Sequence, residues 1–229
     1  MKALVLSSGG LDSTVCVAIA VKEFGAENVA TLSAFYGQRH DKELESAQAV
    51  ADHFGLAHYV IDLSMIFAES ENPLLKKAEN KIPLCSYAEQ QKENKRVATY
   101  VPFRNGLLLS SAASFAGSIF PDEEVTIMYG AHADDAAGEA YADCSQAFVE
   151  AIESAIKIGT YDKVRLFAPL VAMTKADVVK KGIELNAPLG LTWSCYNGGE
   201  KQCGKCGTCI DRRKAFEING MEDPVGYEQ

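Results

Sequence analysis

The sequence SGGLDS at residues 8–13 decides how the rest of this chain is interpreted. It follows a short apolar run, Ala3–Leu6, and it precedes an apolar segment, Val15–Val21, that meets no helix breaker before Gly25. This pattern predicts a strand, a tight loop and a helix. Because the first backbone N–H groups of a helix and the positive end of its dipole favour an anion, we expect the loop to bind a nucleotide phosphate.

The residue types within the loop suit that role. Gly9 and Gly10 let a phosphate approach without meeting a Cβ atom, and Asp12 either caps the helix or helps to hold Mg²⁺. The loop is neither the Walker pattern GxxxxGK[ST], because no lysine follows Gly10, nor the dinucleotide fingerprint GxGxxG. A glycine-serine turn with a helix N-cap is the alternative. The candidate nucleotide-binding residues are Ser7, Ser8, Gly9, Gly10, Leu11, Asp12, Ser13 and Thr14.

Length and composition describe an ordinary globular chain. It has 229 residues, of which 48% are hydrophobic and 23% charged, enough for one sizeable core. The net charge of −9 argues against broad binding to nucleic acid, which needs a basic surface, so a small-molecule substrate fits better. The start, MKALVLSSGG, has too few apolar residues for a signal peptide, and no later run reaches the length of a membrane span. We therefore expect a cytoplasmic protein with no membrane partner.

Strand patterns alternate with helix patterns along most of the chain, which predicts a parallel sheet with right-handed crossovers. The fold class we expect is α/β, with a doubly wound, five-stranded parallel sheet. The expected strands are residues 3–6, 29–35, 59–63, 124–129 and 164–168. The expected later helices are residues 41–54, 106–116 and 145–158, and one that begins after Thr174 with a capping box to Asp177.

Two regions depart from this alternation. Residues 64–97 form a polar insertion rich in lysine and glutamate, which is either a lid over the substrate or a solvated helix. From Gly190 onward, glycines and cysteines replace the periodic pattern. We therefore expect an α/β domain at residues 1–189, with the insertion at about 64–97, and a small C-terminal module at residues 190–229.

Polar clusters follow several predicted strands, and parallel strands end at one edge of a sheet, where ligands bind. Arg39 and Arg104 are candidates to hold a phosphate or a carboxylate, with a surface arginine as the alternative. Asn105 is either a helix cap or a ligand contact. Lys175 either reaches a phosphate from the start of its helix or is an exposed lysine.

Three carboxylates form the acidic group of this edge: Asp134, Asp135 and Asp143. They either bind Mg²⁺, or accept hydrogen bonds from the edge of a purine, or form a solvated acidic loop.

Four cysteines near the C-terminus have the spacing of a metal site. Cys203, Cys206 and Cys209 form CxxCxxC, and Cys195 lies eight residues upstream. Four thiolates satisfy the tetrahedral preference of Zn²⁺ and leave no open position, so we expect a structural zinc ion. An iron–sulfur cluster and a redox pair at Cys206 and Cys209 are the alternatives.

Taken together, these motifs resemble the 7-cyano-7-deazaguanine synthase family of queuosine precursor biosynthesis, within the pyrophosphate-loop ATP pyrophosphatase superfamily. The resemblance covers nearly the full length. It depends on SGGLDST (8–14), FYGQRH (35–40), VPFRN (101–105), YADC (141–144), APL (168–170), TKAD (174–177), WSCY (193–196) and CGKCGTC (203–209). The sequence differs from the family where residues 136–140 and YADC replace an aromatic-rich loop and YPDC, which affects base recognition.

The resemblance implies an adenine nucleotide alpha hydrolase-like fold and an ATP-dependent carbon–nitrogen ligase. ATP would adenylate the carboxylate of 7-carboxy-7-deazaguanine, ammonia would displace AMP, and a second adenylation of the amide would lead to the nitrile. It implies catalytic roles for Asp12, Arg39 and Lys175, and substrate contacts for Arg104, Asn105, Asp134, Asp135 and Asp143. ATP, Mg²⁺ and a structural zinc are the implied cofactors, and a homodimer is compatible with the sequence.

Three other functions remain open. A tRNA-thiolating enzyme of the same superfamily would need a catalytic cysteine, for which Cys85 or Cys144 could serve, and a basic face. An amidating ligase of the NAD or GMP synthetase type does not suit the FYGQRH and CGKCGTC motifs. A non-catalytic zinc-ribbon module would bind a nucleotide or a partner protein without releasing pyrophosphate.

Overall fold

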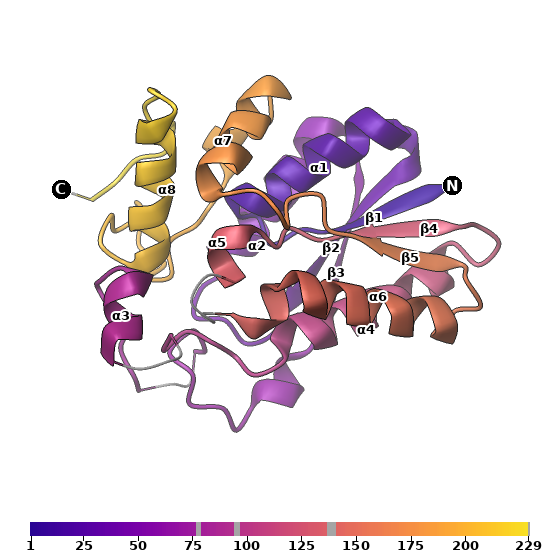
Figure 1. Ribbon diagram of the computed structural model, residues 1–229, viewed down its shortest axis with the longest axis horizontal. Helices are drawn as coiled ribbons and strands as arrows, with labels where there is room; N and C mark the ends of the chain where they lie inside the picture. The colour runs from indigo at the N-terminus through magenta and orange to yellow at the C-terminus, as the bar shows by residue number, and fades with distance from the viewer. Residues whose placement is uncertain (77–78, 94–96, 137–140, 229) are drawn as a thin grey trace.

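A five-stranded parallel sheet forms the centre of the computed structural model, which describes residues 1–76, 79–93, 97–136 and 141–228 (Figure 1). The strand order is β3-β2-β1-β4-β5. The strands are β1 (Lys2–Leu6), β2 (Val29–Phe35), β3 (Ala57–Asp62), β4 (Val125–Met128) and β5 (Val164–Phe167). This confirms the predicted α/β class, and β3 begins two residues before the expected start.

The strand order reverses between β1 and β4. Both strands are parallel, with Leu4 paired to Ala30 of β2 on one side and to Ile127 of β4 on the other. Successive crossovers leave β1 in opposite directions, which opens a crevice at the carboxyl ends of these two strands. The loop after β1 and the loop after β4 therefore meet at the edge where the sequence predicted a site.

Helices cover both faces of the sheet and explain why the centre of β1 is apolar, since Ala3, Leu4 and Val5 are fully buried. On one face, α1 (Leu11–Phe24), α2 (Lys42–Phe54) and α7 (Lys175–Glu184) pack around Val5. On the other, α4 (Arg104–Ile119) and α6 (Gln146–Gly159) pack around Leu4 (Figure 1). The capping box predicted at Thr174 and Asp177 is present at the start of α7.

The C-terminal region contains helix α8 (Gly207–Ile218), which the sequence pattern did not predict. Its Ala215 and Phe216 belong to the same hydrophobic cluster as α1 and α7. Arg212 of α8 is fully buried and donates to both carboxylate oxygens of Asp223, at 2.7 and 3.0 Å. Because the charged residue Arg212 lies on the buried face of α8, the sequence shows no clear apolar face there. The domain boundary near residue 189 stays a prediction.

The insertion at residues 64–97 contains a 3-10 turn at Ser64–Phe67 and a short helix, α3 (Tyr87–Glu93). Figure 1 shows α3 beside α8, at the end of the molecule where the strands finish. The Tyr87 hydroxyl lies 2.9 Å from the Tyr196 hydroxyl of the cysteine-rich region. Helix α3 of the insertion therefore contacts the cysteine-rich region.

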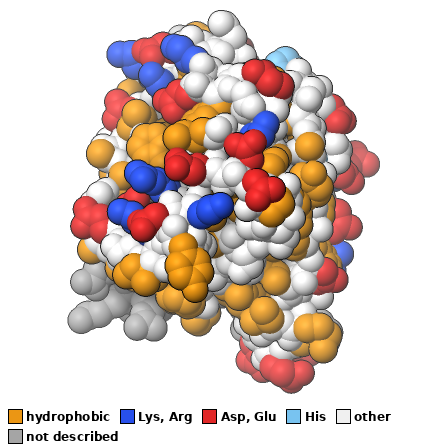
Figure 2. Space-filling view, turned by 90° about the vertical axis from the view of Figure 1, so that its right-hand side faces the viewer, with side chains coloured by type: hydrophobic (Ala, Val, Ile, Leu, Met, Phe, Trp, Pro, Cys, Tyr) orange, Lys and Arg blue, Asp and Glu red, His pale blue; other side chains and the backbone are white. Residues whose placement is uncertain are grey.

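The opposite end of the molecule, where the strands begin, carries both charged and apolar side chains. Figure 2 shows acidic and basic side chains interspersed there, with apolar side chains between them. Within the described residues, no helix has both the length and the apolar character needed to cross a lipid bilayer. The remaining short helix, α5 (Ala133–Ala136), follows β4 on the side of the crevice.

Candidate active site

The loop between β1 and α1 is held by its own hydroxyl groups. The Ser13 hydroxyl accepts from the Ser8 backbone N–H at 3.2 Å and donates to the Gly10 carbonyl at 3.1 Å. Gly9 has a φ of +76°, a region that favours glycine. Gly10 is the N-cap of α1 and no side chain caps the helix, so its first N–H groups face the crevice without an intrahelical partner. The predicted cap by Asp12 is therefore absent.

Asp12 is instead paired with Lys175. The Lys175 ammonium donates to both carboxylate oxygens, at 2.7 and 2.6 Å, and lies 3.4 Å from His132 Nε2. Burial raises the pKa of Asp12, but the charges of Lys175 and His132 outweigh this effect, so its pKa is lowered and the carboxylate is ionised. Because Lys175 starts α7 and Asp12 lies in α1, the pair joins two helices at the mouth of the crevice.

The two acidic residues after β4 have different surroundings. Asp135 lines the pocket beside His132, with its Oδ2 3.3 Å from His132 Nε2, and burial raises its pKa. Asp134 does not line the pocket; it accepts from the Lys175 backbone N–H at 2.7 Å. The Asp134 carboxylate therefore satisfies the start of α7, and its expected substrate contact stays a prediction.

Arg104, Tyr36 and Glu43 form a second charged region in the same pocket. The Arg104 guanidinium donates to the Tyr36 hydroxyl at 3.3 Å and lies 5.3 Å from the centre of its ring. Burial raises the pKa of Glu43 to about 7, although the positive charge of Arg104 acts to lower it. The predicted pocket position of Arg104 is therefore observed, and Glu43 is a residue that the sequence analysis missed.

Asn105 and Asp143 connect the start of α4 to the segment before α6. The Asp143 carboxylate accepts from the Asn105 backbone N–H at 3.0 Å, while the Asn105 side-chain amide lies 3.4 Å from Cys144 Sγ. Asn105 lines the pocket, but Asp143 does not. One oxygen of the Asp143 carboxylate therefore serves the helix N-terminus, while its Oδ1 is buried without a hydrogen-bond partner in the described part of the chain, and the expected substrate contact stays a prediction. The altered family loop at residues 136–140 lies largely outside the described residues.

The structure places Arg39 away from the pocket. Its guanidinium donates to the carbonyls of Pro73 and Asn80, both in the insertion, and Arg39 is not a lining residue. The catalytic role expected for Arg39 stays a prediction. An arginine side chain is several ångströms long, so the position of Arg39 after a strand did not determine which residues its guanidinium contacts.

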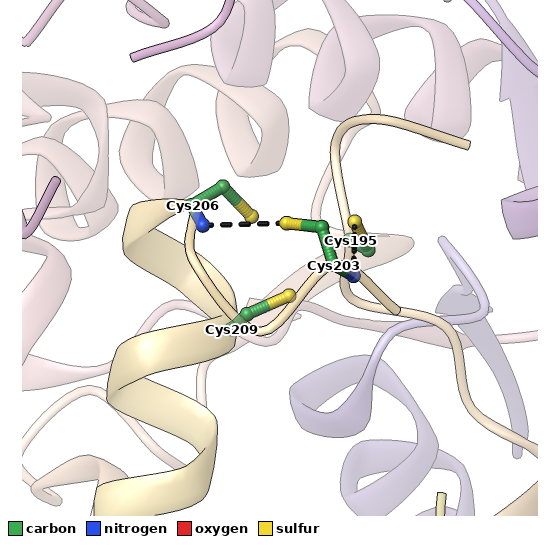
Figure 3. Close-up of side chains that lie close together, drawn as sticks. All are labelled: Cys195, Cys203, Cys206 and Cys209. Carbon is green, nitrogen blue, oxygen red and sulfur yellow. Dashed lines mark hydrogen bonds between the residues drawn. The ribbon is translucent and has the colours of Figure 1, made fainter. Parts of the chain in front are cut away.

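The four predicted metal ligands lie together in the C-terminal region. Their sulfur atoms are all within 4.8 Å of one another and all four residues are buried (Figure 3). Cys203 Sγ accepts from the Cys206 backbone N–H at 3.3 Å, and Cys195 Sγ accepts from the Cys203 N–H at 3.3 Å. Sulfur atoms of a tetrahedral zinc site are about 3.8 Å apart, since Zn–S bonds are about 2.3 Å long. The cluster could therefore hold a zinc ion.

The pocket has a volume of about 240 Å³ and draws its walls from both halves of the chain. Asp211 and Thr208 of α8 line it together with the loop after β1. It is also lined by five tyrosines, none of which the sequence analysis chose as a site residue: Tyr36, Tyr87, Tyr129, Tyr141 and Tyr196. Three of them, Tyr36, Tyr141 and Tyr196, stand within the strings FYGQRH, YADC and WSCY, so only these had a signal in the sequence.

Comparison with known proteins identifies the relatives of this chain. The family described as "Queuosine biosynthesis protein QueC" matches residues 2–220. A 7-cyano-7-deazaguanine synthase from Caldicellulosiruptor saccharolyticus is 41% identical over 228 residues, covering 100% of this chain and 96% of the relative. The enzyme of the same name from Archaeoglobus fulgidus is 40% identical over 226 residues, covering 98% of this chain and 90% of the relative.

Solved structures share the fold at low sequence identity. The NMN synthetase from Francisella tularensis has a TM-score of 0.51 and 13% identity, and the match covers 96% of this chain and 78% of that structure. At this identity the similarity concerns the fold alone.

Proposed function

Because the chain belongs to the QueC family of queuosine biosynthesis proteins, we propose that it converts 7-carboxy-7-deazaguanine and ammonia to 7-cyano-7-deazaguanine with consumption of ATP. The relatives carry the name 7-cyano-7-deazaguanine synthase and align along the whole chain. The observation that carries the proposal is the Asp12–Lys175 pair beside the uncapped start of α1, in one pocket with Arg104.

The reaction needs two adenylations. In the first, a carboxylate oxygen of the substrate attacks the α-phosphorus of ATP and pyrophosphate leaves. Ammonia then attacks the carbonyl carbon, AMP leaves and a proton is lost, which gives the amide. In the second, the amide oxygen attacks the α-phosphorus of another ATP and pyrophosphate leaves. Loss of AMP and of both protons from nitrogen then gives the nitrile.

The loop residues supply the groups that the departing pyrophosphate requires. Negative charge develops on the leaving group as its bond to the α-phosphorus breaks, and fixed donors aimed at that charge stabilise the transition state. The free N–H groups at the start of α1 and the Lys175 ammonium are such donors. In the free enzyme Asp12 holds Lys175 in place, and the nucleotide would compete for the same ammonium.

A magnesium ion would accompany the nucleotide. Mg²⁺ commonly binds through one or two carboxylates together with substrate phosphates. Among the described residues, three or more metal-ligating side chains come together only at the four cysteines. The pocket carboxylates therefore do not form a complete magnesium site by themselves. Asp12 would hold the ion together with phosphate oxygens, and the ion would neutralise charge on the leaving pyrophosphate.

Zinc has a structural role in this proposal. Four thiolates fill a tetrahedral zinc shell, so no position is left for a substrate or for water. The tetrad adjoins two pocket residues, since Tyr196 follows Cys195 and Thr208 lies between Cys206 and Cys209. Zinc would therefore shape the pocket wall without taking part in the chemistry.

The thiolating alternative lacks a suitable cysteine in the pocket. Cys144 lines the pocket but is buried, and that burial, together with nearby Asp135, raises its pKa and disfavours the thiolate. Cys85 is not a lining residue. The amidating and thiolating chemistries both begin with adenylation, so the substrate decides between them.

The test is to incubate the purified protein with ATP, Mg²⁺, ammonium and 7-carboxy-7-deazaguanine and to follow AMP and product mass. We expect the nitrile and AMP from the wild type, and loss of both in Asp12→Ala. AMP formation with another acceptor only, or no AMP at all, would refute the proposed substrate or the proposed reaction.

A further inference from the structure

Two of the three carboxylates that the sequence suggested as partners for the purine edge of the substrate make hydrogen bonds at the starts of helices instead. Asp134 accepts from the Lys175 N–H and Asp143 from the Asn105 N–H, so both carboxylates serve helix starts. A 7-deazaguanine presents a carbonyl oxygen, a ring N–H and an amino group along one edge. Recognition of that edge needs a hydrogen-bond donor beside an acceptor with two free lone pairs.

Glu43 has the required acceptors. It lies in the first turn of α2, lines the pocket, and its carboxylate makes no hydrogen bond or ion pair to another described residue. A partly buried carboxylate without hydrogen bonds carries a desolvation penalty, which a ligand with N–H donors would relieve. Arg104, whose charge acts on Glu43, supplies the adjacent donor.

These two residues occupy a different part of the pocket from the phosphate-binding residues. Asp12, His132 and Lys175 interact with one another. Arg104 and Glu43 interact with each other and with Tyr36.

Glu43 is also fixed relative to the nucleotide loop. A Cβ atom added to Gly9 would lie 2.0 Å from the Glu43 carbonyl oxygen and 2.7 Å from the Ala47 nitrogen. The backbone of the loop therefore packs directly on the first turn of α2. This contact sets the distance between the start of α1 and the Glu43 side chain.

We propose that Glu43 and Arg104 together recognise the aminopyrimidinone edge of the deazaguanine substrate. The two oxygens of the Glu43 carboxylate accept from the ring N–H and the amino group, while the Arg104 guanidinium donates to the carbonyl oxygen. This assignment depends on the proposed function, because it names the binding residues for that substrate. It replaces Asp134 and Asp143 as the acceptors.

The same pair suits the adenine of ATP less well. Adenine has one donor, its amino group, and an adjacent ring nitrogen that only accepts hydrogen bonds. A carboxylate that reaches both positions would make one hydrogen bond and face one repulsive lone pair, which selects against adenine.

The experiment measures binding of 7-cyano-7-deazaguanine by calorimetry, without ATP, so it needs no turnover. The second ligand is the analogue that lacks the amino group. Wild type is expected to bind the parent base at least about 10-fold more tightly than the analogue, because a charge-assisted hydrogen bond is lost. Glu43→Gln is expected to lose about 10-fold for the parent base and much less for the analogue. Glu45→Gln, an exposed change on the same helix, is the matched control and should bind like wild type.

Three results would overturn the assignment: equal affinity of wild type for both bases, equal loss for both bases in Glu43→Gln, or an effect of Glu43→Gln on the KM for ATP alone. The comparison of the two bases on wild type does not depend on folding of a variant. A wild-type enzyme that binds the parent base selectively but makes no nitrile would refute the proposed reaction and leave the recognition intact.

Discussion

The Asp12–Lys175 ion pair is the residue-level feature on which the proposed chemistry depends. Lys175 reaches from the start of α7 to within 2.7 Å of the Asp12 carboxylate, at the end of the helix whose N–H groups face the crevice. A positive charge at this position stabilises the pyrophosphate that leaves, and it does so more strongly in the transition state than in bound ATP.

Replacing Lys175 with methionine should therefore lower kcat for AMP formation by about 10²-fold, the usual effect of removing one preorganised donor. The apolar stem of methionine preserves packing at the start of α7. Lys180→Met, on the same helix but exposed, is the matched control and should remain close to wild type. Equal rates for Lys175→Met and Lys180→Met, measured by AMP release, would exclude a catalytic role for Lys175.

The Glu43 carboxylate gives a stability prediction that depends on pH. Burial raises its pKa from 4.5 to about 7, while Arg104 of α4 and Tyr36 after β2 are the groups that face it. A raised carboxyl pKa means that the folded state holds the proton more tightly than the unfolded state. The penalty for ionising Glu43 is therefore small near pH 4.5, grows as the pH rises, and is complete above about pH 7.

Glu43→Gln should accordingly stabilise the free enzyme more at pH 8 than at pH 5. The difference in the free energy of unfolding is roughly 2 kcal/mol, after allowance for partial exposure. Chemical denaturation at the two pH values measures it, with Glu45→Gln as the baseline. If Glu43→Gln destabilises the protein equally at both pH values, the carboxylate has a structural partner that the structure does not reveal.

At this scale the sequence identified groups that lie in contiguous motifs and missed those that come together only in space. Asp12 and Lys175 were expected at the site because SGGLDS and the start of a helix after β5 constrain them. Glu43 was missed, since a glutamate in the first turn of a helix is normally explained by the helix dipole. Asp134 and Asp143 were assigned to the base, but nothing in the spacing distinguishes a ligand contact from a helix cap.

Among the elements, the nucleotide loop and α2 pack closely at Gly9. Gly9 has a φ of +76°, and a Cβ atom there would lie 2.0 Å from the Glu43 carbonyl oxygen. Gly55, at the end of α2, has a φ of +68° but has nothing within 4 Å of its Cβ position. Substitution of Gly55 therefore tests the backbone conformation alone, whereas substitution of Gly9 tests the backbone conformation and steric contact together.

Gly55→Ala should cost about 1 kcal/mol of stability through its backbone conformation alone. Gly9→Ala should cost clearly more and should also weaken ATP binding, because α2 must move away from the loop. Thermal unfolding and nucleotide titration measure these effects. Similar stability losses with unchanged ATP affinity would show that the loop and α2 are not coupled.

The hydrogen bond between Tyr87 of α3 and Tyr196 joins the insertion to the cysteine-rich region across the pocket. Its removal in Tyr87→Phe should cost about 1 kcal/mol, which corresponds to about a fivefold increase in KM for the deazaguanine substrate with kcat nearly unchanged. Tyr161→Phe, at a highly exposed position, provides the control. An unchanged KM in Tyr87→Phe would mean that the insertion does not help to close the pocket.

The elements that the sequence predicted well are those with a clear apolar period. The strands of the sheet and helices α1, α2, α6 and α7 were expected within a few residues of their observed bounds. Helix α8 was missed because its buried face contains Arg212, whose charge is satisfied by Asp223. Such a pairing is visible only in three dimensions.

For the whole molecule, the cysteine tetrad connects stability to the site. Its small cluster includes Trp193, whose backbone N–H donates to the Gly9 carbonyl at 2.9 Å, and the tetrad begins the helix that brings Asp211 to the pocket. Loss of the metal should therefore affect both the fold of residues 190–229 and nucleotide binding.

We expect one zinc ion per chain by elemental analysis, and chelation should lower the unfolding temperature by several degrees or more, because structural zinc contributes on the order of 10 kcal/mol. Cys206→Ser should reproduce the effect, whereas Cys85→Ser, outside the tetrad, should not. Iron in place of zinc would favour the iron–sulfur alternative, and the absence of any bound metal would contradict the tetrad as a metal site.

The arrangement of the whole chain was predictable from the order of its elements, whereas the pocket was not. Alternating strands and helices determine a parallel sheet, and a doubly wound order brings the loops after β1 and β4 together. The walls made by the insertion and by α8 come from segments without a regular pattern, so their side chains could not be placed in advance.

The proposed reaction requires that oxygen leave the carboxylate of the substrate as part of AMP, twice for each nitrile. The most direct measurement uses 7-carboxy-7-deazaguanine labelled with ¹⁸O in both carboxyl positions, together with ATP and ammonium, and determines the mass of the AMP formed. We expect two AMP for each nitrile, each carrying one ¹⁸O. Unlabelled AMP, or label in inorganic phosphate with formation of ADP, would contradict the proposed reaction.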